Sequence, residues 1–142
     1  MADLPQTLVL EVATPLGLVL RTDAESVQAP SVDGEFGVYA GHLPLLAALK
    51  PGVLRYRLAG KTYVAAVGAG FVEAEPDRVL LLTDAFLLPS QIDEDAVRLE
   101  EEAADKAIAA FGERHEGLEY EELERRLQWA DARLLARRED KS

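Results

Sequence analysis

Short alternating segments separated by turn residues fill the chain up to Pro89, and they limit its possible folds most strongly. In the first segment Leu8, Leu10 and Val12 take every second position, which is the pattern of a half-buried strand. Comparable segments follow at 16–20, 26–29, 53–58, 62–67, 69–74 and 78–83. Regular spacing of this kind without helical periodicity favours a β-sandwich or barrel. We therefore predict an all-β N-terminal antiparallel β-sandwich over residues 1–89.

Residues 34–52 form the most heavily punctuated part of the chain. They include four glycines and two prolines, so the backbone must turn tightly and repeatedly. The apolar runs between these residues are too short for an independent helix and fit strands or turn edges. We predict a rigid corner here. Its polar side chains, Glu35, His42 and Lys50, have no neighbours in sequence that would complete a catalytic set.

After Pro89 the pattern becomes helical. Asp93 is a good N-cap, and acidic residues follow it in the first turn, where the helix dipole favours negative charge. A first apolar stripe with helical spacing consists of Ala96, Leu99, Ala103, Ala107 and Ala110. After a break bracketed by glycines, a second stripe consists of Tyr120, Leu123, Leu127, Ala130 and Leu134. We predict an α-helical hairpin, a two-helix antiparallel coiled coil, over residues 90–142.

The first stripe is mostly alanine, and this bears on how firmly the hairpin is held. Alanine buries far less apolar area than leucine, at roughly 25 cal/mol per Å². Local stability follows the number of buried apolar contacts. We therefore predict that the tail is a mobile element that can open or detach.

Charge excludes some partners and divides the chain. The formal net charge of −11 argues against nucleic acid, because phosphate binding depends on counterion release by Lys and Arg. Up to Pro89 there are ten acidic and six basic residues, whereas the much shorter remainder has sixteen and nine, which indicates a domain boundary. Basic residues gather at the end of the tail, at Arg125, Arg126, Arg133, Arg137 and Arg138. They either complement the helix dipole or dock on an acidic partner.

Membrane insertion and catalysis both lack a sequence signal. No apolar run reaches the ~18 to 20 residues that span a bilayer, and the polar start lacks the basic leader of a signal peptide. The glycines at 68 and 70 begin a dinucleotide-like pattern, but Glu73 replaces the third glycine, so a tight turn or bulge explains them better. His42 and His115 fall in different predicted domains, and the chain has no cysteine. We expect no catalytic, cofactor or metal site, and membrane contact only through partners.

Two motifs carry a family resemblance. Gly-Glu-Phe-Gly-Val-Tyr-x-Gly-His-x-Pro-Leu-Leu begins at residue 34, and Gly-x-Gly-Phe-Val-Glu-x-x-Pro-Asp-x-Val begins at residue 68. The chain resembles the epsilon subunit of F-type ATP synthases, the counterpart of mitochondrial delta, over nearly its whole length. The resemblance implies a non-catalytic central-stalk subunit of a proton-translocating complex. Such a subunit couples the membrane c-ring to the gamma shaft on the cytoplasmic face of the bacterial inner membrane.

The resemblance also implies roles for particular residues. Glu35 and His42 match positions that contact the rotor ring in the family, and a titratable histidine there would make the contact pH-sensitive. The tail of bacterial members can reach the alpha and beta subunits and inhibit ATP hydrolysis. Its basic residues, named above, then meet an acidic segment of the catalytic subunit.

Some members bind ATP through Ile-Asp-x-x-Arg-Ala at the start of the first tail helix. Here that run begins at Ile92, and Ala96 stands in place of the arginine. Arg98 lies two positions further, which rotates it by about 200° on a helix. We therefore predict weak or absent ATP binding.

Two other classes of protein remain open on the residues alone. A small β-fold enzyme would need a convergent polar constellation, and the sequence offers none. A free-standing β-sandwich adaptor could use the hairpin to bind other helices.

Overall fold

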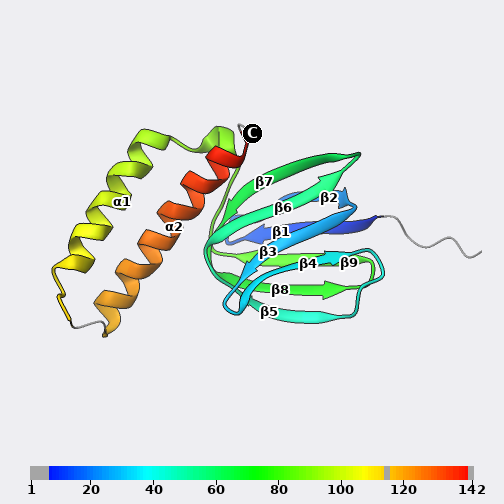
Figure 1. Ribbon diagram of the computed structural model, residues 1–142. Coiled ribbons are helices and arrows are strands. Elements are labelled where there is room, and N and C mark those ends of the chain that lie inside the picture. Colours follow the sequence, from blue (N-terminus) through cyan, green and yellow to red (C-terminus); the bar gives the residue numbers. More distant parts are fainter. Residues whose placement is uncertain (1–6, 114–115, 141–142) are drawn as a thin grey trace, which may run out of the picture.

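The computed structural model describes residues 7–113 and 116–140, and Figure 1 shows how the elements are arranged. The strands are β1 (Leu8–Thr14), β2 (Gly17–Ala24), β3 (Ser26–Ser31), β4 (Gly34–Tyr39), β5 (Leu45–Leu49), β6 (Gly52–Leu58), β7 (Lys61–Val67), β8 (Gly70–Glu75), β9 (Arg78–Thr83) and β10 (Phe86–Leu87). A short 3₁₀ helix, η1 (Pro89–Gln91), leads to the helices α1 (Glu94–Ala109) and α2 (Leu118–Asp140). The predicted fold class, a β-sandwich followed by a helical hairpin, is confirmed.

The strands fold into two layers. One layer has the order β10, β7, β6, β3, with β4 paired to β3, and the other has the order β5, β8, β9, β1, β2. A single residue pair, Ser31 with Leu49, joins the layers. Neighbouring strands are antiparallel except β1 and β9, which run parallel from Val9 and Arg78 onward. The hairpins β6–β7 and β8–β9 form at the turns that the sequence indicated.

The core lies between these layers. In β1 the side chains of Leu8, Leu10 and Val12 are buried, as their period-two spacing predicts. They meet inward-facing residues of both layers: Ala24, Val27, Ala29, Val38, Leu49, Leu54, Val67, Val72, Ala74, Val79 and Leu81.

Residues 34–52 make the predicted corner. Because β4 belongs to one layer and β5 to the other, residues 40–44 carry the chain around one end of the sandwich. Gly41 has a φ of +84° there, a conformation that glycine adopts without strain, and its N–H donates to the Pro76 carbonyl at 2.7 Å.

The two glycines after β7 are explained by close packing rather than by a ligand. A Cβ at Gly70 would collide with the carbonyl oxygen of Leu82 in β9, and one at Gly68 would collide with the carboxylate of Asp84. Gly70 therefore needs a residue without a side chain, because its obstacle is backbone, whereas the nearest obstacle at Gly68 is the end of the Asp84 side chain.

The helices stack on one layer of the sandwich, with α2 between α1 and strands β6 and β7 (Figure 1). Asp93 caps α1 as predicted, because its Oδ1 accepts a hydrogen bond from the Ala96 N–H at 3.2 Å. A second apolar cluster joins helices and strands: Val53, Val64, Ala66, Ile92, Val97, Ala130 and Ala136, bordered by Leu87, Trp129 and Leu134. The division into domains at 1–89 and 90–142 stays a prediction.

The predicted stripe on α1 is wrong in part. Leu99 is 67% exposed, and Ala96, Ala103 and Ala110 are exposed with it. The buried residues of α1 are Val97 and Ala104, and Ala107 and Ile108 are half-buried. Ala103 and Ala107 of the predicted stripe nevertheless line the groove between α1 and α2, so the stripe is wrong in part and not along its whole length. On α2 the predicted stripe is buried or half-buried throughout.

Candidate partner-binding surfaces

Glu35 lies in β4 and belongs to a chain of polar contacts. Gln28 Nε2 donates to Glu35 Oε2 at 3.1 Å, and Arg55 Nη1 donates to Glu35 Oε1 at 2.8 Å. Arg55 also donates from Nε and Nη2 to the two carboxylate oxygens of Glu139, both at 2.6 Å. The candidate ring residue is thereby linked to the last turn of α2. This link has no signal in the sequence, because the three charged residues are far apart along the chain.

Arg55 responds electrostatically to both acids. The hydrogen bond with Glu139 raises the pKa of Arg55 most, burial opposes this, and the hydrogen bond with Glu35 raises it further. The guanidinium is therefore permanently charged, and it is shared between two carboxylates.

His42 lies just beyond the other end of β4. Its Nδ1 is 2.8 Å from the Tyr39 carbonyl oxygen, and because a carbonyl only accepts, Nδ1 must carry the proton. Nε2 is buried and has no hydrogen-bond partner within the described residues. Glu35 and His42 are not brought together, since four strand steps of about 3.3 Å separate Glu35 from Tyr39 alone.

These two residues bracket an exposed strand edge. In the part of the chain that the structure describes, β4 pairs only with β3, so its second edge is free. Large apolar side chains lie exposed on or next to it, at Val32, Tyr39 and Leu43. We call this surface, from Val32 to Leu43, the β4 edge. Tyr39 lies between the acid and the histidine, and Val32 and Leu43 lie just outside them.

A second exposed surface lies on the outer side of the other layer. Phe71 pairs with Leu82, Leu82 with Ala13, and Ala13 with Leu18, so these side chains form one row across β8, β9, β1 and β2. Phe71 is 59% exposed and Leu82 50%. Leu46 of β5 adds to them from the next row. We call these residues the bare sheet face, and contiguous exposed apolar surface of this kind marks an interaction site.

The bare sheet face was not predicted from the sequence. Its signal was weak, because the outward positions of β8 combine Phe71 with Glu73 and Glu75, and only β9 has neighbouring apolar residues, Leu80 and Leu82, on its outward side. A strand that is apolar on both sides is expected to be covered on both. The opposite side of the sandwich is covered by α2, whereas nothing in the described residues covers this one.

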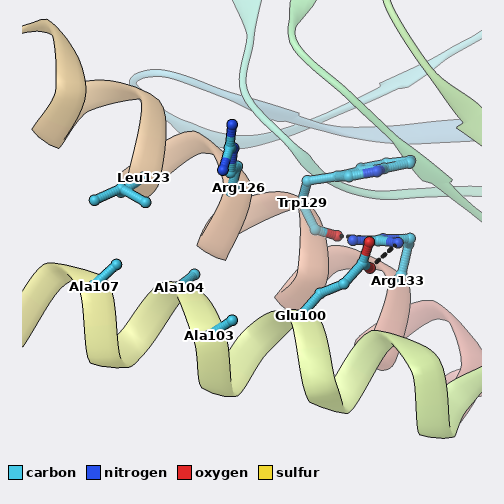
Figure 2. Close-up of a pocket in the computed structure, with 8 residues that line it drawn as sticks. All are labelled: Glu100, Ala103, Ala104, Ala107, Leu123, Arg126, Trp129 and Arg133. Carbon is cyan, nitrogen blue, oxygen red and sulfur yellow. Dashed lines mark hydrogen bonds and ion pairs between the residues drawn. The ribbon is translucent and has the colours of Figure 1, made fainter.

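A groove of about 410 Å³ runs between the two helices (Figure 2). Alanines of α1 form one wall, and Arg126, Trp129 and Arg133 of α2 line the other. Arg133 Nη1 is 2.6 Å from Glu100 Oε2, and its Nε donates to the Trp129 carbonyl at 3.2 Å. Its guanidinium also lies 5.1 Å from the centre of the Trp129 ring. Arg133 is therefore engaged within the chain and offers little to a phosphate.

The segment that corresponds to the family's ATP-binding motif begins at Ile92 and continues into the first turn of α1. Ala96 is exposed there, and Arg98 pairs with Glu94 at 3.1 Å. These contacts agree with weak or absent ATP binding, which stays a prediction.

The five basic residues of the tail differ in their surroundings. Arg137 Nη1 donates to the Pro89 carbonyl at 2.9 Å, and Arg133 is held as described above. Arg126 pairs with Glu122 at 2.8 Å but remains exposed, and Arg125 and Arg138 are exposed as well. Three of the five, Arg126, Arg133 and Arg137, would have to leave intrachain contacts to meet a partner.

Within residues 7–113 and 116–140, no three acidic or histidine side chains gather as a metal site would need. His115, the second histidine of the chain, lies outside these residues. In the same part of the chain, neither α-helix combines the length and apolarity that crossing a bilayer requires.

Residues 7–89 match the family described as the ATP synthase, delta/epsilon chain, beta-sandwich domain. An ATP synthase epsilon chain from Magnetococcus marinus is 38% identical over 130 residues, which are 92% of this chain and 93% of the relative. One from Halalkalibacterium halodurans is 36% identical over 90% of this chain and 95% of the relative.

Solved structures share the fold. A chain of the Euglena gracilis mitochondrial ATP synthase, in a cryo-EM structure of OSCP, F1 and c-ring, matches with a TM-score of 0.78. The match covers 95% of this chain and 83% of that one, at 21% identity.

Proposed function

Because this chain belongs to the family of ATP synthase delta and epsilon chains, we propose that it joins the membrane c-ring to the gamma shaft in the central stalk. Proteins named in this way are structural or regulatory subunits of the complex and not catalytic ones, and this chain is of that kind. The role requires a stiff body with separate surfaces for separate partners. Two sheets around one continuous core supply the stiffness.

The bare sheet face is the proposed contact for the gamma shaft. It is the single observation that carries the proposal, because it exposes Phe71, Leu82, Leu18 and Leu46 on one side while the chain's own tail covers the other. Exposed apolar side chains in neighbouring strands are stabilised by burial against a partner, at roughly 25 cal/mol per Å².

The β4 edge is the proposed contact for the c-ring. Glu35 offers a carboxylate to a cationic group, and Tyr39 and Leu43 offer apolar surface beside it. His42 closes the far end of this edge. The chain would then reach the membrane through the ring alone, on the cytoplasmic face of a bacterial inner membrane.

The helical tail is the proposed regulatory element. In its docked position the tail buries mainly alanines against the sandwich. Because alanine buries little apolar area, separating the tail from the sandwich costs only a modest free energy. After release, Arg125, Arg126, Arg133, Arg137 and Arg138 would be available to an acidic surface of the alpha and beta subunits and would restrain ATP hydrolysis.

Co-purification tests the proposal. A tagged copy of the chain, expressed in cells that contain its native partners, is expected to retain gamma, the c-ring, alpha and beta after washing. A lone monodisperse chain with catalytic turnover would support the small enzyme instead. A lone chain that captures unrelated helical proteins would support the adaptor.

A further inference from the structure

One arginine connects the sandwich to the end of the tail. Arg55 projects from β6 and grips Glu139 with two nitrogens, while its third reaches Glu35. The side chains of Arg55 and Glu139 are only 20% and 27% exposed. A two-pronged, partly buried pair of this kind is stronger than an ordinary surface ion pair, because its charges are less screened by water.

The ion pair between Arg55 and Glu139 lies where α2 packs against the sandwich. Glu139 lies in the last turn of α2, one turn beyond Ala136, which is fully buried against the sandwich. Arg137, between them, holds the Pro89 carbonyl at the start of the tail. Releasing α2 must therefore break the Arg55 contact.

The charge of Glu35 opposes this grip. With Arg55 between them, Glu35 and Glu139 share one positive charge and repel each other. A cation that binds Glu35 from outside would neutralise the charge of Glu35. Arg55 would then interact with Glu139 without competition from Glu35. Conversely, when the tail leaves, Arg55 is free to neutralise Glu35 fully.

We propose that Arg55 is a latch for the docked tail, and that a cationic partner group at Glu35 tightens it. The inference rests on the proposed ring contact at the β4 edge and on the proposed release of the tail. Because coupling between two sites is reciprocal, a docked tail also makes Glu35 a better ligand for that cation. Ring engagement and tail docking thus reinforce each other.

The test measures tail release in the isolated full-length chain. The protein has no cysteine, so Ala136→Cys places a single thiol at a fully buried position of α2, in the apolar cluster that includes Val53. A small thiol reagent then labels the open form, at a rate proportional to its population when closing is faster than labelling. Every variant is made in this background, and circular dichroism checks that the sandwich is folded.

We expect Arg55→Gln and Glu139→Gln each to speed labelling about tenfold or more, as losing a charge-assisted hydrogen bond predicts. The double variant should be no faster than either single one, because both remove the same contact. Arg57→Gln, two residues along the same strand, is the matched control and should leave the rate unchanged. Glu35→Gln keeps an acceptor for Arg55 but removes the charge, so it should slow labelling by about twofold or more.

Two results would overturn the inference: Arg55→Gln labelling no faster than Arg57→Gln, or Glu35→Gln labelling faster than the unaltered background. Glu139→Gln keeps the test decisive if the Arg55 variant fails to fold, since the last turn of a helix is not needed for the sandwich. Loss of c-ring binding is a separate measurement. If the labelling pattern holds but the chain does not bind a c-ring, the proposed ring surface fails and the latch stands.

Discussion

Arg55 of β6 and Glu139 of α2 meet in a two-pronged ion pair with both N···O distances at 2.6 Å, although 84 residues separate them. Around this polar contact the tail presents mostly small side chains to the sandwich, with Ala130, Ala132 and Ala136 buried. The docked tail is therefore held by a specific charged contact at its end and by a light apolar seam along its length. That combination favours a defined docked position that can still be left.

Glu35→Ala and His42→Ala should each weaken c-ring binding about five- to tenfold, because each removes one polar contact at the rim of an interface. The two residues lie at opposite ends of β4, so their effects on the binding free energy should add within about 0.5 kcal/mol. Binding of the purified chain to isolated c-rings measures this. Asp23→Ala, an exposed acid in β2, is the control. Full binding by the double variant would rule out the assignment.

The helical hairpin should become less stable as the pH rises above the ordinary pKa of a glutamate side chain. The pKa of Glu101 is raised above its ordinary value. The largest cause is the hydrogen bond with Asp131, and desolvation raises the pKa further by a smaller amount, while the charges of Arg98 and Arg138 lower it. A raised folded pKa stabilises the hairpin fully below the unfolded pKa, and this stabilisation is lost as pH rises through the folded value. Thermal unfolding followed at 222 nm between pH 4 and 7 should show the trend.

Glu101→Gln should remove that trend, because the amide keeps the hydrogen bond at every pH. Glu102→Gln, on the exposed neighbouring position, should leave it in place. An unchanged pH dependence in Glu101→Gln would contradict the account of this pair.

Amides of α1 should exchange with solvent much faster than those of β1 and β9. Among the described residues α1 buries only Val97 and Ala104, whereas β1 is paired on both sides, with β9 and β2, and places Leu8, Leu10 and Val12 in the core. Hydrogen exchange followed by mass spectrometry gives both rates in one experiment. Equal protection of α1 and the core strands would show that the tail is not a separately opening unit.

ATP should not bind with a sub-millimolar dissociation constant, because Ala96 lacks a guanidinium and Arg133 is already paired with Glu100. Isothermal titration calorimetry of the isolated chain measures this. Ala96→Arg should increase the affinity, and Ala109→Arg, at an exposed position near the other end of α1, should not. Tight binding by the unaltered chain would refute the prediction.

Much of the fold could be predicted from the sequence because its signals are local. Alternation in β1 predicts its inward residues, and Asp93 marks the start of α1 through a hydrogen bond to a residue three positions ahead. In β6 and β7 the burial does not alternate, because α2 covers the outer side of these strands. The parallel pairing of β1 with β9 could not be predicted, since it joins segments almost 70 residues apart in the chain. Part of the stripe on α1 was misplaced because small apolar residues occupy two of its faces.

The candidate surfaces were less accessible to sequence reasoning. The motif around Glu35 and His42 identified the β4 edge, but only tertiary structure shows that Arg55 ties Glu35 to Glu139. The bare sheet face depends on which strands become neighbours. Phe71 and Leu82 look like ordinary strand residues until the pairing places them in one exposed row.

The affinity of the chain for the gamma subunit tests the central claim most directly. Phe71→Glu with Leu82→Glu places two charges on the bare sheet face without touching the core, and should weaken binding at least tenfold by surface plasmon resonance. Leu99→Glu, an equally exposed apolar position on α1, should bind like the unaltered chain. Undiminished gamma binding by the folded double variant would contradict the proposed stalk role of this surface.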